Sequence, residues 1–294
     1  MIPMVRQLAK YGRTVGKRSE LTWRYLLNLQ PTLSYALNPG ALPNEAARVL
    51  YDLNRNGVAL TSVQALLGEN SCYGELTRAV DQREVDMASQ LDAFRASMVD
   101  GTQAAQKRYV TGLLPENGPL NPRDVYVRLA LQDPIPQIVN AYYGMYVSLR
   151  HCNIWHNFVT KDKPSQSQLW HRDPEDRYIL KMFVYLVDVD EGSGPFVYAG
   201  GSHPKRKLPR APAFHHKDGN TPRSDDAQMA EVVPADQWVT CLGPRGTIVF
   251  ADTRGYHKGG LARERDRILY VCEFLSQAAG RGGISTARRR NSNH

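Results

Sequence analysis

Two histidines and an aspartate, far apart in the chain, set the strongest constraint on how this sequence can fold. His171 and Asp173 are separated by one residue, and His257 follows 84 residues after Asp173. On a β-strand, residues i and i+2 point to the same face, so the first two side chains can reach a common point. His257 must then come from a distant strand that the fold brings alongside, as happens when strands wrap into a barrel or jelly roll.

These residue types match the ligands of one kind of metal site. Two neutral imidazole nitrogens and one carboxylate oxygen suit Fe(II) and leave three octahedral positions open for a chelating cosubstrate and O2. A structural metal site would usually be closed by protein ligands, so open positions indicate chemistry. The short triplet alone is weak, because it arises by chance: a histidine near strands is usually hydrogen-bonded, and an aspartate before Pro174 can be a turn residue.

Composition describes an ordinary globular protein. With 294 residues the chain can bury a sizeable core, as one large β-rich domain with helical additions or as two small domains. No apolar run approaches the ~18 residues of a membrane span, and residues 1–24 contain no apolar signal core. The four cysteines are scattered without a C-x-x-C pair, which is typical of free thiols in a reducing compartment. We therefore expect a cytoplasmic protein without a membrane span.

The formal net charge of +8 is concentrated at the two ends of the chain. Residues 1–24 contribute +5 and residues 281–294 contribute +4, so the body between them carries about −1. A nucleic-acid groove should itself be basic, so nucleic acid is not the expected partner. Basic ends are most often solvated, and less often weak anchors for anionic lipid, nucleic acid or a partner chain. An Arg-rich, acid-poor start also resembles a mitochondrial targeting segment, which is a minor alternative.

Apolar spacing divides the chain into a helical first part and a strand-rich second part. The expected helices cover residues 20–37, 43–56, 62–67, 76–98, 123–132 and 137–143, with a strand at 57–61 and a turn at 117–122. The expected strands cover residues 145–160, 178–187, 195–199, 238–242, 247–251 and 267–274. Short strands without strand–helix alternation indicate a sandwich or barrel. Residues 205–226 are polar and Pro-rich, and a loop of that length is typical of a functional lid or a disordered segment.

Over residues 45–275 the sequence resembles the phytanoyl-CoA dioxygenase-like group of non-haem Fe(II)/2-oxoglutarate-dependent oxygenases. The resemblance is carried by residues 54–60, 170–173, 185–195 with 201–204, and 246–257 with 267–274. It implies a β-rich α+β fold: a double-stranded β-helix (jelly-roll, cupin-like) core with the helical N-terminal half packed against it. The expected organisation is a basic, helical N-terminal extension at 1–44, an oxygenase domain at 45–280 with its β-core mainly at 144–275, and a basic C-terminal tail at 281–294.

The resemblance also implies the cofactors and the role of the triad. His171, Asp173 and His257 would bind Fe(II), and 2-oxoglutarate and O2 would be cosubstrates. The implied activity is oxidation, most simply hydroxylation, of an aliphatic C–H bond in a small or medium-sized organic molecule, with release of succinate and CO2. The substrate, the reaction outcome (hydroxylation, desaturation, epoxidation or ring closure) and the oligomeric state are left open.

Arg267, ten residues after the distal histidine, is expected to bind the C5 carboxylate of 2-oxoglutarate. A planar guanidinium pairs bidentately with a carboxylate and keeps its charge when buried. Arg263 and Arg265 are close rivals, and a surface ion pair is the alternative role of Arg267. The choice of Arg267 among the three rests on its offset in the family.

Four further residues are candidates for the cosubstrate pocket. The family often places an aromatic residue on the strand after the first two ligands, where Phe183 stands; Lys181 and Tyr185 share its face by period-2 alternation. Asn157 lies on the preceding strand, where the family often has a cosubstrate contact. The chain departs from the family pattern at Gly259, where a serine or threonine often contributes a hydroxyl.

Two other functions fit part of the sequence pattern. The same metal chemistry could act on a nucleic-acid base or a protein side chain, with the basic ends as anchors, although the near-neutral body argues against it. A non-catalytic jelly-roll binding protein could hold a metal or nothing at the triad. It would show no 2-oxoglutarate turnover and little stabilisation by Fe(II) with 2-oxoglutarate.

Overall fold

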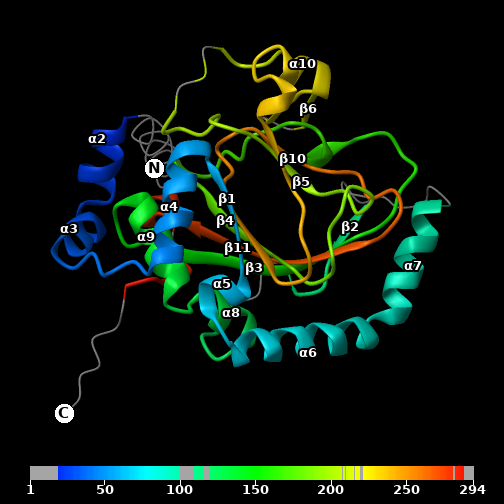
Figure 1. Ribbon diagram of the computed structural model, residues 1–294, viewed down its shortest axis with the longest axis horizontal. Coiled ribbons are helices and arrows are strands. Elements are labelled where there is room, and N and C mark those ends of the chain that lie inside the picture. Colours follow the sequence, from blue (N-terminus) through cyan, green and yellow to red (C-terminus); the bar gives the residue numbers. More distant parts are fainter. Residues whose placement is uncertain are drawn as a thin grey trace, which may run out of the picture.

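Antiparallel strands, mostly from the second half of the chain, form the centre of the molecule (Figure 1). The structure is a computed structural model that describes residues 19–99, 109–115, 119–206, 208, 210–214, 216–218, 221–280 and 282–287. Within these residues the larger sheet has the order β1 (Val58–Ser62), β9 (Thr247–Asp252), β4 (Leu180–Tyr185), β11 (Arg267–Leu275), β3 (Ser148–Asn157) and β12 (Ile284–Ser285), with β2 (Val110–Gly112) also paired to β3. The smaller sheet has the order β10 (His257–Gly259), β5 (Phe196–Ala199) and β8 (Trp238–Cys241).

Strand alternation gives the larger sheet two buried faces. On β4, Met182 and Val184 belong to the core beneath the helices, whereas Phe183 and Tyr185 belong to a second cluster between the two sheets. The second cluster also contains Phe196 from the smaller sheet, so the two sheets pack face to face. Every other residue of β4 and β11 therefore points into the space between the sheets, where a site can form.

Helices cover the outer face of the larger sheet. α4 (Asn44–Asn56) buries Ala46, Val49 and Leu53, which recur on one helical face, and ends at Gly57 with a φ of 80°. α9 (Pro134–Tyr143), α8 (Val125–Ala130) and α6 (Ser71–Asp86) contribute to the same core. α6 and α7 (Ala88–Val99) follow the bottom and the right edge of Figure 1. Helices on an antiparallel framework make this an α+β architecture.

The described part of the N-terminal segment packs on this framework. It forms α2 (Glu20–Thr22), a π-helical turn (Trp23–Leu27) and α3 (Leu29–Leu37). Trp23 is completely buried, and its indole Nε1 donates to Asp176 Oδ1 at 3.0 Å. Glu20 pairs with Arg177 at 2.5 Å. The domain boundary expected at residue 44 stays a prediction, and residues 1–18 of that segment lie outside the described residues.

The C-terminal segment also adds to the sheet. β12 pairs with β3 through Ile284 and Ser285, inside the range expected as a tail, whereas residues 281 and 288–294 are not described. Among the described helices, none combines the length and apolar character needed to cross a membrane.

Most expected elements are confirmed, and the differences have local causes. Residues 76–98 were expected as one helix or a helix pair, and the structure has the pair α6 and α7 with the first helix beginning at Ser71. Residues 205–226 were expected as a loop; where described, they contain the hairpin β6 (His216–Asp218) and β7 (Thr221–Arg223) and lead into α10 (Asp226–Ala230). The short strand β2 was not expected, because three residues carry no periodic signal. The turn expected at 117–122 lies partly outside the described residues.

Candidate metal centre and cosubstrate pocket

The three candidate ligands meet where the chain crosses from one sheet to the other. His171 and His257 form an isolated antiparallel bridge in which each backbone N–H donates to the other residue's carbonyl, at 3.0 and 3.1 Å. The Asp173 N–H donates to the Thr253 carbonyl at 2.9 Å. The ligand atoms of all three side chains lie within 4.8 Å of one another. His171 and Asp173 do not lie in a regular strand; the bridge to β10 holds them instead.

Hydrogen bonds orient both imidazoles. His171 Nδ1 lies 2.8 Å from the Leu169 carbonyl and His257 Nδ1 lies 3.0 Å from the Gly255 carbonyl. A carbonyl oxygen can only accept, so each Nδ1 carries the proton and each Nε2 keeps its lone pair. The two Nε2 atoms each lie 3.8 Å from an oxygen of Asp173. Tautomer control by a backbone carbonyl is the usual arrangement behind a metal-binding histidine.

The charge states of the triad also suit metal ligation. Burial and the neighbouring His257 lower the pKa of His171 well below 6.5, and burial lowers the pKa of His257, so both rings are neutral at pH 7. Burial works against ionisation of Asp173, but the Lys181 ammonium and the two histidines lower the pKa of its carboxyl. The site therefore offers two neutral nitrogens and one carboxylate.

Lys181 bridges the triad and the inner face of the larger sheet. Its ammonium lies 2.7 Å from Asp173 Oδ2 and 3.4 Å from Glu273 Oε1. Burial opposes the lysine charge, but these two carboxylates raise the pKa of Lys181. Register places Lys181 opposite Glu273, and Glu273 opposite His151, so the three form one row across β4, β11 and β3.

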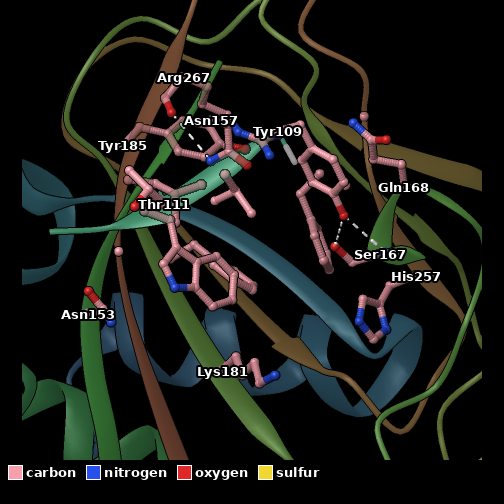
Figure 2. Close-up of a pocket in the computed structure, with 18 of the residues that line it drawn as sticks. Tyr109, Thr111, Asn153, Asn157, Ser167, Gln168, Lys181, Tyr185, His257 and Arg267 are labelled. Carbon is pink, nitrogen blue, oxygen red and sulfur yellow. Dashed lines mark hydrogen bonds between the residues drawn. The ribbon is translucent and has the colours of Figure 1, made fainter. Parts of the chain in front are cut away.

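A cavity of about 560 Å³ between the sheets contains the triad. All eight residues expected from the sequence line it: His171, Asp173, His257, Arg267, Phe183, Asn157, Lys181 and Tyr185. Figure 2 shows Arg267, Asn157 and Tyr185 at one end, and Lys181 and His257 at the other. The cavity is therefore polar at both ends.

Arg267 is the one of the three candidate arginines that lines the cavity. It is 5% exposed, and one of its terminal nitrogens donates to the Gly194 carbonyl. Arg263 instead donates to the carbonyls of Thr160 and Asp162, at 2.6 and 3.0 Å. Arg265 precedes β11, and its exposed side chain pairs with Asp190.

The contact between Arg267 and Gly194 depends on a close approach of two loops. Gly194 has a φ of 68°, and a Cβ there would lie 2.4 Å from the backbone nitrogen of Ala262. The Gly260 N–H donates to the Pro195 carbonyl at 2.7 Å, which joins the same loops. Only glycine allows this approach, so the Gly-Ser-Gly-Pro turn places its carbonyl against the guanidinium.

The remaining expected pocket residues differ in what they present to the cavity. The Tyr185 hydroxyl donates to the Cys241 carbonyl at 2.6 Å, so its ring rather than its hydroxyl faces the space. The Asn157 amide donates to the Arg267 carbonyl at 3.3 Å (Figure 2). The Phe183 ring lies 5.0 Å from the Phe196 ring and forms an apolar wall.

Several lining residues were missed by the sequence reasoning. Asn153 and Trp155 share the inward face of β3 with Asn157, and period-2 alternation could have identified them. Tyr109 comes from the segment before β2, and its hydroxyl lies 2.6 Å from Ser167 Oγ, as Figure 2 shows. No sequence signal connects Tyr109 with Ser167, because the two residues lie 58 positions apart and meet only in the folded chain.

Gly259 lies beside Arg267, as the family position implies. A Cβ at Gly259 would lie 3.7 Å from Arg267 Nη2 and would meet no closer atom. His203 is fully buried outside the cavity lining; burial lowers its pKa to about 4, and its Nε2 lies 3.2 Å from the Asn54 carbonyl. Gly259 therefore lines the cavity, whereas His203 does not.

Comparison with solved structures finds several similar proteins. The crystal structure of EctD from S. alaskensis with bound Fe has a TM-score of 0.52 and 16% identity, over 85% of this chain and 85% of that chain. The epimerase SnoN in complex with Fe3+, alpha ketoglutarate and nogalamycin RO has a TM-score of 0.48 and 15% identity, over 80% and 84% of the two chains. The non-heme alpha ketoglutarate dependent carbocyclase SnoK from nogalamycin biosynthesis has a TM-score of 0.47 and 14% identity, over 81% and 87%.

The EctD likeness shows a shared fold. No family model and no curated protein sequence matches this chain. What the site does must therefore be argued from its own residues.

Proposed function

We propose that this protein is an Fe(II)- and 2-oxoglutarate-dependent dioxygenase that oxidises an aliphatic C–H bond of a small or medium-sized organic molecule, most simply by hydroxylation. One observation carries the proposal: a His–Asp–His cluster and a buried arginine line the same cavity. The proposal includes the double-stranded β-helix as the fold, supported by two antiparallel sheets packed face to face, and the phytanoyl-CoA dioxygenase-like group as the family.

The donor set fits an Fe(II) ion. His171 and His257 would each bind it through Nε2, since Nδ1 is engaged with a backbone carbonyl in both rings. Asp173 would bind it as a carboxylate, kept ionised by the Lys181 ammonium. Three such ligands leave coordination positions open, which a reactive site requires.

Arg267 fits one carboxylate of 2-oxoglutarate. Its Nε is buried and has no hydrogen-bond partner among the described residues. A buried donor without a partner is costly, and a carboxylate would satisfy it with a charge-assisted hydrogen bond. Burial lowers the pKa of this guanidinium, yet arginine keeps its charge at pH 7.

The chain's own residues would bind the iron and 2-oxoglutarate, orient them and shield them from water. When bound, iron and 2-oxoglutarate would supply the oxidising chemistry, taking up O2 and releasing succinate and CO2. Arg267 would orient the cosubstrate, and the backbone bridge between His171 and His257 would hold the ligand geometry. The aromatic rings of Phe183 and Phe196 would exclude water from the reacting centre.

Succinate release tests the proposal. Anaerobically purified protein is given Fe(II) and 2-oxoglutarate and then O2, beside a His171→Ala variant and a His156→Gln variant. His156 lies outside the cavity lining, so it controls for loss of a buried histidine. We expect slow turnover without substrate in the wild type and in His156→Gln, and none in His171→Ala.

A second measurement separates a substrate-gated enzyme from a binding protein. If no variant releases succinate, thermal unfolding is measured with Fe(II) and 2-oxoglutarate. Occupancy at 100 times the dissociation constant would stabilise the wild type by about 2.7 kcal/mol. Stabilisation absent from His171→Ala would indicate that substrate is needed for turnover. No stabilisation of either protein would contradict the oxygenase proposal and favour the non-catalytic jelly roll.

A further inference from the structure

The N-terminal helices α2 and α3 lie at one edge of the molecule (Figure 1). Apolar side chains are exposed along this segment. The N-terminal apolar face, as we define it, comprises Leu21, Tyr25, Leu26, Leu29, Leu33 and Leu37. Leu26 is 74% exposed and Leu37 is 87% exposed. Single exposed apolar residues are normal, but a group of six on three successive helical elements marks an interaction surface.

The leucines of α3 are exposed because the helix is fixed in its orientation by contacts on its other side. Leu29, Leu33 and Leu37 recur every four residues, so they share one face of α3. The opposite side is held by the domain, because Pro31 and Thr32 are buried and the Pro31 carbonyl accepts from the Tyr146 N–H at 3.3 Å. α3 therefore cannot rotate to bury its leucines.

The segment before α3 is held in the same way. Trp23 is buried with its indole hydrogen-bonded to Asp176, and Asn28 Oδ1 accepts from the Ala278 N–H at 3.0 Å. Leu21 and Tyr25 flank Trp23 and point outward, with exposures of 69% and 52%. The apolar face is thus the outward side of helices whose inward side is fixed.

Positive charge adjoins this face in the sequence. Residues 1–18, directly before α2, contain Arg6, Lys10, Arg13, Lys17 and Arg18 and no acidic residue. An apolar helical face beside clustered lysine and arginine is the combination by which peripheral proteins bind bilayers that contain anionic lipid.

We propose that the N-terminal apolar face docks onto an anionic lipid bilayer, with its leucines at the acyl boundary; the basic sequence of residues 1–18 favours anionic over neutral lipid. A bilayer supplies apolar contact and negative charge together. A second copy of this chain would supply the apolar contact, but its residues 1–18 would add five more cations and no acidic residue. Charge therefore favours lipid, and the proposal is independent of the reaction in the cavity.

Vesicle co-sedimentation tests the docking. The full chain is mixed with vesicles of phosphatidylcholine and phosphatidylglycerol, or of phosphatidylcholine alone. The variant Leu33→Glu with Leu37→Glu changes the apolar face. The control Val85→Glu with Leu242→Glu adds the same charge at exposed apolar positions elsewhere, 70% and 39% exposed.

We expect the wild type and the control to bind the anionic vesicles and not the neutral ones, and added salt to weaken binding. The Leu33→Glu, Leu37→Glu variant should bind roughly tenfold or more weakly, because its apolar side chains no longer enter the acyl boundary. Absence of wild-type binding, or equal binding by this variant, would overturn the proposal. So would a dimer, seen by light scattering, that the same variant abolishes, because the partner would then be a second copy.

Discussion

Replacement of Arg267 by glutamine gives the sharpest test of the cosubstrate pocket. The side chain is 5% exposed, and its Nε has no hydrogen-bond partner among the described residues. If a carboxylate binds there, glutamine leaves that carboxylate in a buried site without its counter-charge. Loss of one partner of a buried charge pair costs about 2–5 kcal/mol, which corresponds to roughly 30-fold to several-thousand-fold in affinity.

The assay is succinate formation at varied 2-oxoglutarate concentration, with KM and kcat determined separately. We expect KM for 2-oxoglutarate to rise by the factor above in Arg267→Gln. Arg267→Lys keeps the charge but loses the planar guanidinium that pairs bidentately with a carboxylate, so its KM should lie between those of the wild type and Arg267→Gln. Far-ultraviolet circular dichroism checks that each variant is folded, since Arg267 also donates to the Gly194 carbonyl.

Arg263→Gln and Arg265→Gln are the matched controls, because their guanidinium groups bind other partners outside the cavity lining. Both should keep KM within about threefold of the wild type, a difference below about 0.7 kcal/mol. Arg267 does not bind the cosubstrate carboxylate if KM in Arg267→Gln also stays within about threefold of the wild type. The same conclusion follows if either control raises KM as much as Arg267→Gln does.

Three further predictions concern the pocket and the framework. Gly259→Ser places a hydroxyl beside Arg267, where a Cβ meets no atom closer than 3.7 Å; KM for 2-oxoglutarate should fall about two- to tenfold, and a rise would contradict this geometry. Trp23→Ala should lower the free energy of unfolding in urea by about 3–5 kcal/mol, against almost no change in Leu21→Ala; a loss below about 1 kcal/mol would favour the domain boundary at residue 44. Burial alone would lower the pKa of His156, but the carboxylates of Asp266 and Glu84 raise it above 6.5. The stabilising effect of the charged imidazole is therefore complete below pH 6.5 and is lost as pH rises through the folded-state pKa. His156→Gln should lower the melting temperature more at pH 6 than at pH 9. An equal decrease at both pH values would refute the ion pairing of His156 with Asp266 and Glu84.

The sequence alone determined features that depend on short-range pattern and on residue chemistry. The helix over residues 43–56 was predicted because apolar residues recur at helical spacing before a glycine, and α4 ends at Asn56 with Gly57 in the left-handed region. The ligand types and the spacing of His171 and Asp173 predicted a metal triad, and the three side chains do meet. The pocket face of β4 followed from period-2 alternation.

Only the tertiary structure decided which groups complete the cavity. Arg263 and Arg265 were rivals of Arg267 in the sequence, and only the structure shows that Arg267 alone of the three lines the cavity between the sheets. Tyr109 enters the wall because β2 pairs with β3, across about forty residues of chain. Trp23 joins the core through Asp176, 153 positions away. Such contacts depend on strand register and packing between distant segments, and local periodicity carries no information about either.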